Sequence, residues 1–159
     1  MTRALLILTI YATSVCCVSC GNPSDQELLD RFRANSDDFR LLVSMLQEDA
    51  DITRLTSENV FMSNDSNRVL PVERLAKYRW LMKKLHLDGG VHRDTVSSIR
   101  LIANSPMSRL WPTVEKSYLF SSDPSCRIVQ ATDDLNQTNN QEPVCKAINA
   151  QWYIRYETW

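Results

Sequence analysis

The chain has 159 residues, and its 18 basic and 19 acidic side chains give a formal net charge of −1. Hydrophobic residues make up 43% and charged residues 23%, which predicts one folded domain rather than a disordered chain. Affinity for nucleic acid depends on Lys and Arg that neutralise phosphates, and the sequence has no basic stripe with interleaved aromatic residues. Composition therefore argues against nucleic acid as a partner.

The amino-terminal segment predicts export. Met1-Thr2-Arg3 forms a short basic start, and the run from Ala4 to Val18 is apolar, as in a signal peptide. A membrane-spanning helix needs about twenty apolar residues, and the polar segment 21–25 interrupts this run too early. We therefore predict a signal peptide over residues 1–19, and a permanent transmembrane anchor is the weaker alternative.

The end of this segment, Cys17-Val18-Ser19-Cys20, resembles a bacterial lipobox, although Leu is usual where this chain has Cys17. The resemblance implies that Cys20 becomes the new terminus and carries acyl chains such as palmitate, which anchor the protein to the bacterial cell envelope. Gly21 after the cysteine slightly favours the periplasmic side of the outer membrane. The alternative is an ordinary secretory signal cut near Ser19 or Cys20.

The mature chain begins with a short linker, residues 20–26, and a predicted helix. Apolar positions alternate at steps of four and three residues, which predicts one amphipathic helix. The stripe comprises Leu28, Phe32, Asn35, Phe39, Leu42 and Leu46, and Asn35 is its only polar member. Residues 49–69 follow as a predicted loop with one short strand.

Pro71 is suited to the first position of a second helix, which Gly89-Gly90 ends. Its apolar positions are Val72, Leu75, Tyr78, Met82 and Leu85, and its basic remainder is Arg74, Lys77, Arg79, Lys83 and Lys84. The basic face is predicted to be solvated, with contact to a membrane surface as the alternative.

Beyond residue 91 the pattern changes to strands, at 96–102, 114–120 and 148–156. In the last strand Trp152, Ile154 and Tyr156 share one face, while Arg155 and Glu157 lie on the other. The fold prediction is α+β: two amino-terminal amphipathic helices packed on a small antiparallel sheet from the carboxy-terminal half, in a single domain over residues 27–159.

Two cysteines, Cys126 and Cys145, remain once the earlier ones are removed or acylated. They are predicted to form a disulfide, because an exported protein meets an oxidising compartment. The pair lacks the close spacing typical of metal or redox sites. The enclosed polar stretch, 127–144, is then a tethered surface loop.

The strongest candidate for chemistry is a cluster around a glycine turn, in which His86, Asp88 and His92 are weak metal-ligand candidates. Their spacing matches no zinc signature. With three glycines in the chain there is no Gly-rich phosphate loop, and no catalytic motif or cofactor is predicted.

Three segments, Ser24–Leu29, Lys116-Ser117-Tyr118 and Gln151–Glu157, resemble a group of small uncharacterised bacterial lipoproteins. That group has no known catalytic residues, so the resemblance implies export and architecture only. The leading hypothesis is a membrane-anchored envelope lipoprotein that binds or braces an envelope protein partner. The alternative is a secreted or periplasmic protein that binds a small ligand or acts as an enzyme. Its ligand is unknown, and its aromatic pocket would be lined by Trp152 and Tyr156.

Overall fold

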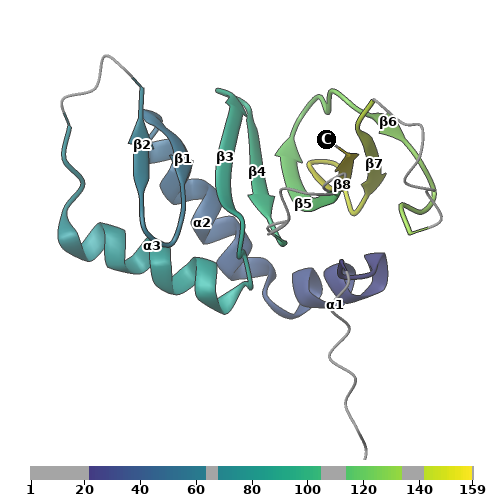
Figure 1. Ribbon diagram of the computed structural model, residues 1–159, viewed down its shortest axis with the longest axis horizontal. Coiled ribbons are helices and arrows are strands. Elements are labelled where there is room, and N and C mark those ends of the chain that lie inside the picture. The colour runs from purple at the N-terminus through teal and green to yellow at the C-terminus, as the bar shows by residue number, and fades with distance from the viewer. Residues whose placement is uncertain (1–21, 64–67, 105–113, 134–141, 159) are drawn as a thin grey trace, which may run out of the picture.

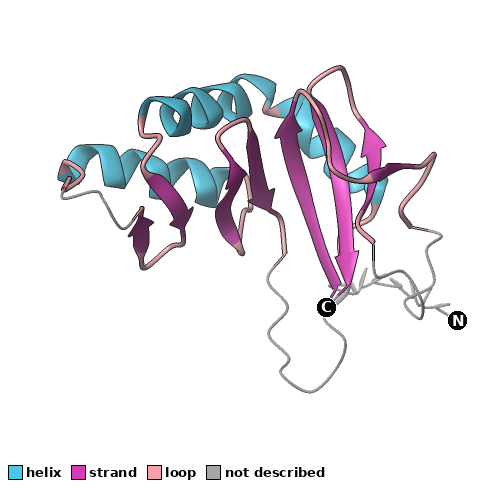
Figure 2. Ribbon diagram, turned by 90° about the horizontal axis from the view of Figure 1, so that it is seen from above, coloured by secondary structure: helices cyan, strands magenta, loops and turns pink. Residues whose placement is uncertain are grey.

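A computed structural model describes residues 22–63, 68–104, 114–133 and 142–158. Over these residues three helices cover one side of a single eight-stranded sheet (Figures 1 and 2). The helices are α1 (Asp25–Ala34), α2 (Ser36–Glu48) and α3 (Val72–Lys84). The strands are β1 (Ile52–Leu55), β2 (Val60–Met62), β3 (Gly90–Thr95), β4 (Ser98–Ile102), β5 (Val114–Ser121), β6 (Arg127–Ile128), β7 (Val144–Ala147) and β8 (Trp152–Thr158). The α+β class is confirmed.

The sheet differs from the predicted one in size, origin and strand direction. Its strand order is β2-β1-β3-β4-β5-β8-β7-β6, and β6 and β7 are parallel, so the sheet is mixed. The hairpin of β1 and β2 precedes α3, where a loop with one short strand was predicted. Ile52 and Leu55 are buried in the core, and this burial stabilises a strand too short to give a clear sequence pattern.

The first helical stripe forms two helices instead of the predicted one, with the break at Asn35. This residue has φ −130°, and its side-chain amide donates to the carbonyl of Arg31 at 2.9 Å. Asn competes for backbone partners in this way and favours helix ends. Phe32 before the break and Phe39 after it are both buried. The stripe therefore predicts the buried positions correctly, but the prediction of one continuous helix is wrong.

Aromatic side chains form the contact between helices α1 and α2 and the sheet. The Phe39 ring centroid lies 4.6 Å from that of Tyr118 in β5 and 5.7 Å from that of Trp152 in β8. Phe32 lies 5.0 Å from Trp152, and the Tyr118 hydroxyl donates to the Leu28 carbonyl at 3.0 Å. Rings at such distances add to the free energy gained from burial alone.

The predicted disulfide between Cys126 and Cys145 is present, with Cα atoms 5.8 Å apart. It joins the residue before β6 to the middle of β7, next to the parallel pair. The bond therefore holds the outermost strand, only two residues long, at the edge of the sheet.

We expect Phe39→Ala to lower the free energy of unfolding by about 3–5 kcal/mol, because a fully buried ring is replaced by a cavity. Leu41→Ala is the matched control, since Leu41 lies on the same helix but is 37% exposed. Urea unfolding followed by circular dichroism measures both. An equal loss in the two variants would contradict the assigned core.

We expect the double variant Cys126→Ala/Cys145→Ala to lose about 3 kcal/mol of unfolding free energy, as a loop of this length predicts. Reducing the parent protein should cause a similar loss, whereas reductant should leave the double variant unchanged. Thermal unfolding with and without reductant provides the measurement. A parent protein insensitive to reductant would show that the bond contributes nothing.

Candidate functional site

The start of the fold is fixed by a buried ionic cluster around Asp25, the first residue of α1. Asp25 is 2% exposed, and its carboxylate accepts from the ammonium groups of Lys116 at 3.1 Å and Lys146 at 3.3 Å. The backbone N–H of Thr132 donates to the same carboxylate at 2.7 Å, and the Thr132 hydroxyl also donates to it. Asp133 accepts from the Asp25 N–H at 2.9 Å and pairs with Lys116. We call these five residues the Asp25 cluster.

Burial by itself raises the pKa of Asp25, but the hydrogen bonds from Thr132 and the charge of Lys116 outweigh burial and lower the pKa to about 2. The sequence prediction assigned Asp25 and Gln26 to a linker, whereas the structure places both in α1. Their helix begins with a capping box formed by Ser24 and Glu27. Local sequence predicts the cap, but not the burial of Asp25.

A second ionic cluster lies on the sheet face opposite the core, centred on Arg100 of β4. Its guanidinium donates to Asp94 at 2.9 Å, to Glu115 at 3.1 Å and to Glu157 at 3.1 Å. Arg155 donates to Glu157 at 3.0 Å and to Asp94 at 3.4 Å. Because these residues belong to β3, β4, β5 and β8, the Arg100 cluster ties four strands together.

The charged groups of the Arg100 cluster change one another's pKa values. Burial lowers the pKa of Arg100, but Asp94, Glu115 and Glu157 reverse this effect and raise it. Burial raises the pKa of Glu115, against the opposing charge of Arg100. Within the described residues, Arg155 Nε is buried without a hydrogen-bond partner. Most of the charged groups are engaged with each other, as expected of a cluster that stabilises the sheet.

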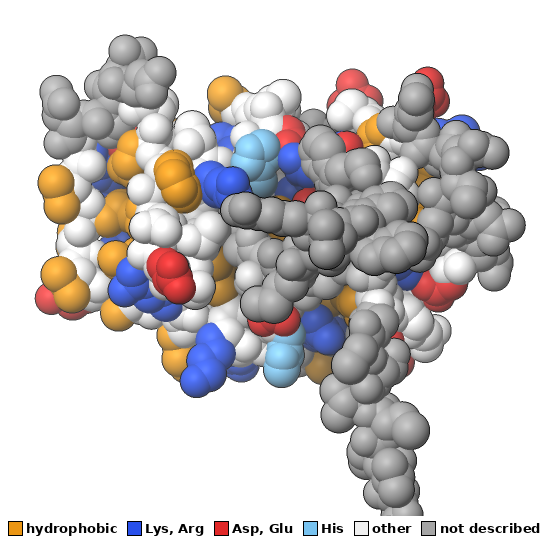
Figure 3. All heavy atoms as spheres, viewed as in Figure 1, with side chains coloured by type: hydrophobic (Ala, Val, Ile, Leu, Met, Phe, Trp, Pro, Cys, Tyr) orange, Lys and Arg blue, Asp and Glu red, His pale blue; other side chains and the backbone are white. Residues whose placement is uncertain are grey.

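The three weak metal-ligand candidates do not form a site. His86 follows α3 with φ 53°, and its carbonyl accepts from Arg31 at 3.4 Å, whereas His92 Nδ1 lies 2.9 Å from Asp94 in the Arg100 cluster. Figure 3 shows the two histidines as separate patches on the surface. Within the described part of the chain, no group of three or more His, Cys, Asp or Glu side chains could hold a metal ion.

The two residues predicted to line an aromatic pocket, Trp152 and Tyr156, are buried, and neither of the two hollows described below contains both of them. Trp152 is 4% exposed beneath Phe32 and Phe39, and Tyr156 packs with Val114 and Val144. A hollow of about 230 Å³ is lined by Trp152, Phe120 and Gln151 together with four residues of α2. Trp159 lies outside the described residues.

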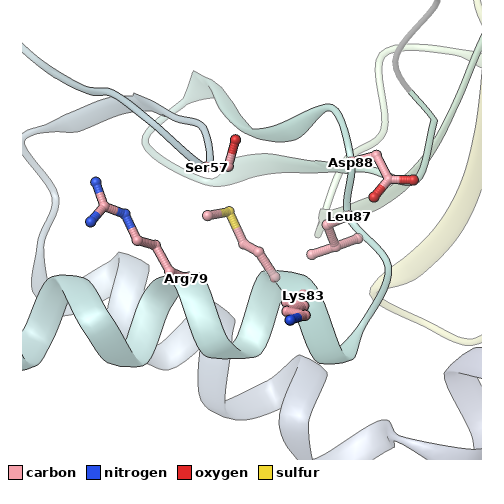
Figure 4. Close-up of a pocket in the computed structure, with 6 residues that line it drawn as sticks. Ser57, Arg79, Lys83, Leu87 and Asp88 are labelled. Atoms are coloured by element: carbon pink, nitrogen blue, oxygen red, sulfur yellow. The ribbon is translucent and has the colours of Figure 1, made fainter.

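A larger hollow of about 330 Å³ lies beside α3. Its lining residues are Ser57, Arg79, Met82, Lys83, Leu87 and Asp88. Figure 4 shows Arg79 and Asp88 at opposite ends of the hollow, with Ser57 and Leu87 between them. The Arg79 guanidinium donates to the Glu58 carbonyl at 3.2 Å, which ties α3 to the β1–β2 turn. Asp88 thus belongs to this hollow and not to a metal site.

No family model, curated protein or solved structure matches this chain. None of the described helices has both the length and the apolar character that a membrane span requires. Cys20 and the predicted signal peptide lie outside the described residues. The functional argument therefore depends on the residues themselves.

The Asp25 cluster predicts a specific pH dependence. The pKa of Asp25 is lower in the folded chain than the ordinary value of 3.8, so its stabilising effect is complete above pH 4 and is lost as the pH falls toward 2. We expect Asp25→Asn to be less stable than the parent by about 2 kcal/mol or more at pH 7, and the difference to shrink below pH 4.

The matched control is Asp30→Asn, an exposed carboxylate on the same helix. Chemical unfolding across this pH range measures both variants. A difference between Asp25→Asn and the parent that stays constant with pH would contradict the role of the Asp25 charge.

Proposed function

We propose that the protein is an envelope lipoprotein, acylated at Cys20, whose folded domain serves as a binding or bracing module and not as an enzyme. The proposal rests on the lipobox-like residues 17–20 together with the position of Asp25. Only residues 21–24 separate Cys20 from this buried aspartate. A fully extended chain of that length reaches about 18 Å at most, so the acyl chains would hold the domain against the bilayer.

The internal ionic clusters also support a bracing role. In addition to the two clusters above, buried Asp49 at the end of α2 accepts from Arg74 at 2.8 Å, from Arg68 at 2.6 Å and from the Tyr78 hydroxyl at 2.7 Å. Each cluster joins elements that are distant in the sequence. Such cross-links favour a rigid body that transmits force from its anchor to a partner.

Acylation at Cys20 can be tested by metabolic labelling with an alkyne fatty acid in a bacterial host. We expect the parent protein to incorporate the label and Cys20→Ser to lose it. Cys16→Ser is the matched control, because this cysteine belongs to the same predicted signal peptide and should leave labelling intact. Equal labelling of the parent and Cys20→Ser would contradict the lipid anchor, as would the absence of label from the parent.

A further inference from the structure

One side of helix α3 exposes apolar side chains in a row. Val72 is 78% exposed and Trp80 is 54% exposed, and with exposed Ala76 they stand four residues apart along the helix. Residues at this spacing lie on the same face. The opposite face carries Tyr78 and buried neighbours that pack in the core.

Cations flank this apolar row on both sides. Lys77, Arg79, Lys83 and Lys84 are exposed, whereas Glu73 is the only acidic residue of the helix. We call this surface, with Val72, Ala76 and Trp80, the α3 outer surface. Figure 3 shows Lys and Arg side chains beside hydrophobic ones, with some Asp and Glu among them, at the end of the molecule that α3 and β2 occupy. Four cations against the one carboxylate of Glu73 give this surface a positive charge, although the formal net charge of the chain is −1.

Two of these four cations are available to a partner, because Arg79 already donates to the Glu58 carbonyl at 3.2 Å and Lys84 is paired. Lys84 pairs with Asp38 at 2.6 Å, but no ion pair joins Lys77 or Lys83 to a carboxylate within the described residues. The Lys84 ammonium also lies 5.0 Å from the Trp80 ring centroid. Solvation accounts for exposed lysines, but it gives no reason for Trp80 and Val72 to occupy the same exposed row.

This combination is typical of helices that lie in the interfacial region of a membrane. Trp is enriched at the level of the headgroups, and long cationic side chains extend from apolar surroundings toward phosphates. Anionic lipids attract such a surface through each Lys or Arg near the bilayer. The helix supplies both components on the face that the core leaves free.

We propose that the α3 outer surface lies against the anionic phospholipid headgroups of the membrane. Charge complementarity argues for this partner, and the position of the predicted anchor agrees with it. Helix α1, whose first residue follows Cys20 by five positions, lies on the same side of the sheet as α3 (Figure 1). The role of the tether rests on the proposed acylation, whereas the surface chemistry does not.

The test uses the mature chain from position 20 with Cys20→Ser, which retains every described helix and strand and has no acyl chain. Its sedimentation is compared on vesicles of equal parts phosphatidylcholine and phosphatidylglycerol and on vesicles of phosphatidylcholine alone. We expect binding to the anionic vesicles that falls as salt is added. Lys77→Gln/Lys83→Gln should weaken it roughly 25-fold, about fivefold for each charge.

The matched control is Arg33→Gln/Arg40→Gln, which removes two exposed cations from α1 and α2 and should change binding little. Trp80→Ala should weaken binding with no loss of charge. Equal binding to both kinds of vesicle, or equal weakening by the control, would overturn the proposal. Because this protein has no acyl chain, failure of vesicle binding leaves the labelling result at Cys20 intact, and the reverse also holds.

Discussion

The packing of Phe39 against Tyr118 and Trp152 is the contact on which the rest of the structure depends. It holds the helical layer on the β5–β8 pair, the central part of the sheet. Helix α1 follows because Phe32 joins the same group of rings. With α1 in this position, the Asp25 carboxylate contacts Lys116 of β5. This contact fixes the amino-terminal end of the folded domain to the sheet. Trp152, one of the two residues that indicated a ligand pocket, is therefore part of the main core, whereas Tyr156 packs in a separate small cluster with Val114 and Val144.

The two faces of the sheet are stabilised by different physical means. The helix-covered face excludes water mainly with apolar side chains, apart from the Asp25 cluster at the start of α1, whereas the opposite face carries the Arg100 cluster across four strands. Its buried charges would be costly alone, and they are tolerated because each guanidinium contacts two or more carboxylates. In this arrangement His92 contacts Asp94, and His92 therefore does not share a site with His86.

The proposed membrane attachment combines two features that are independent in the sequence. In this proposal the lipobox-like segment would supply the anchor, and the buried Asp25 would limit the distance between that anchor and the folded domain. The α3 outer surface then gives the domain an orientation, because its cations and Trp80 face away from the core on the helical side of the sheet. The opposite sheet face would point away from the bilayer, toward other components of the envelope.

The sequence alone determined the features that depend on local periodicity and composition. These are the α+β class, the buried stripe through Phe32 and Phe39, the start of α3 near Pro71 and the Cys126–Cys145 bond. Tertiary structure decided the β1–β2 hairpin, the parallel β6–β7 pair and the ionic clusters around Asp25, Arg100 and Asp49. The physical reason is separation along the chain: Asp25 meets Lys116 and Thr132 across 91 and 107 residues, and no local pattern encodes such a meeting. The exposure of Trp80 and the burial of Trp152 follow the same rule, since only the packed core determines which tryptophan it covers.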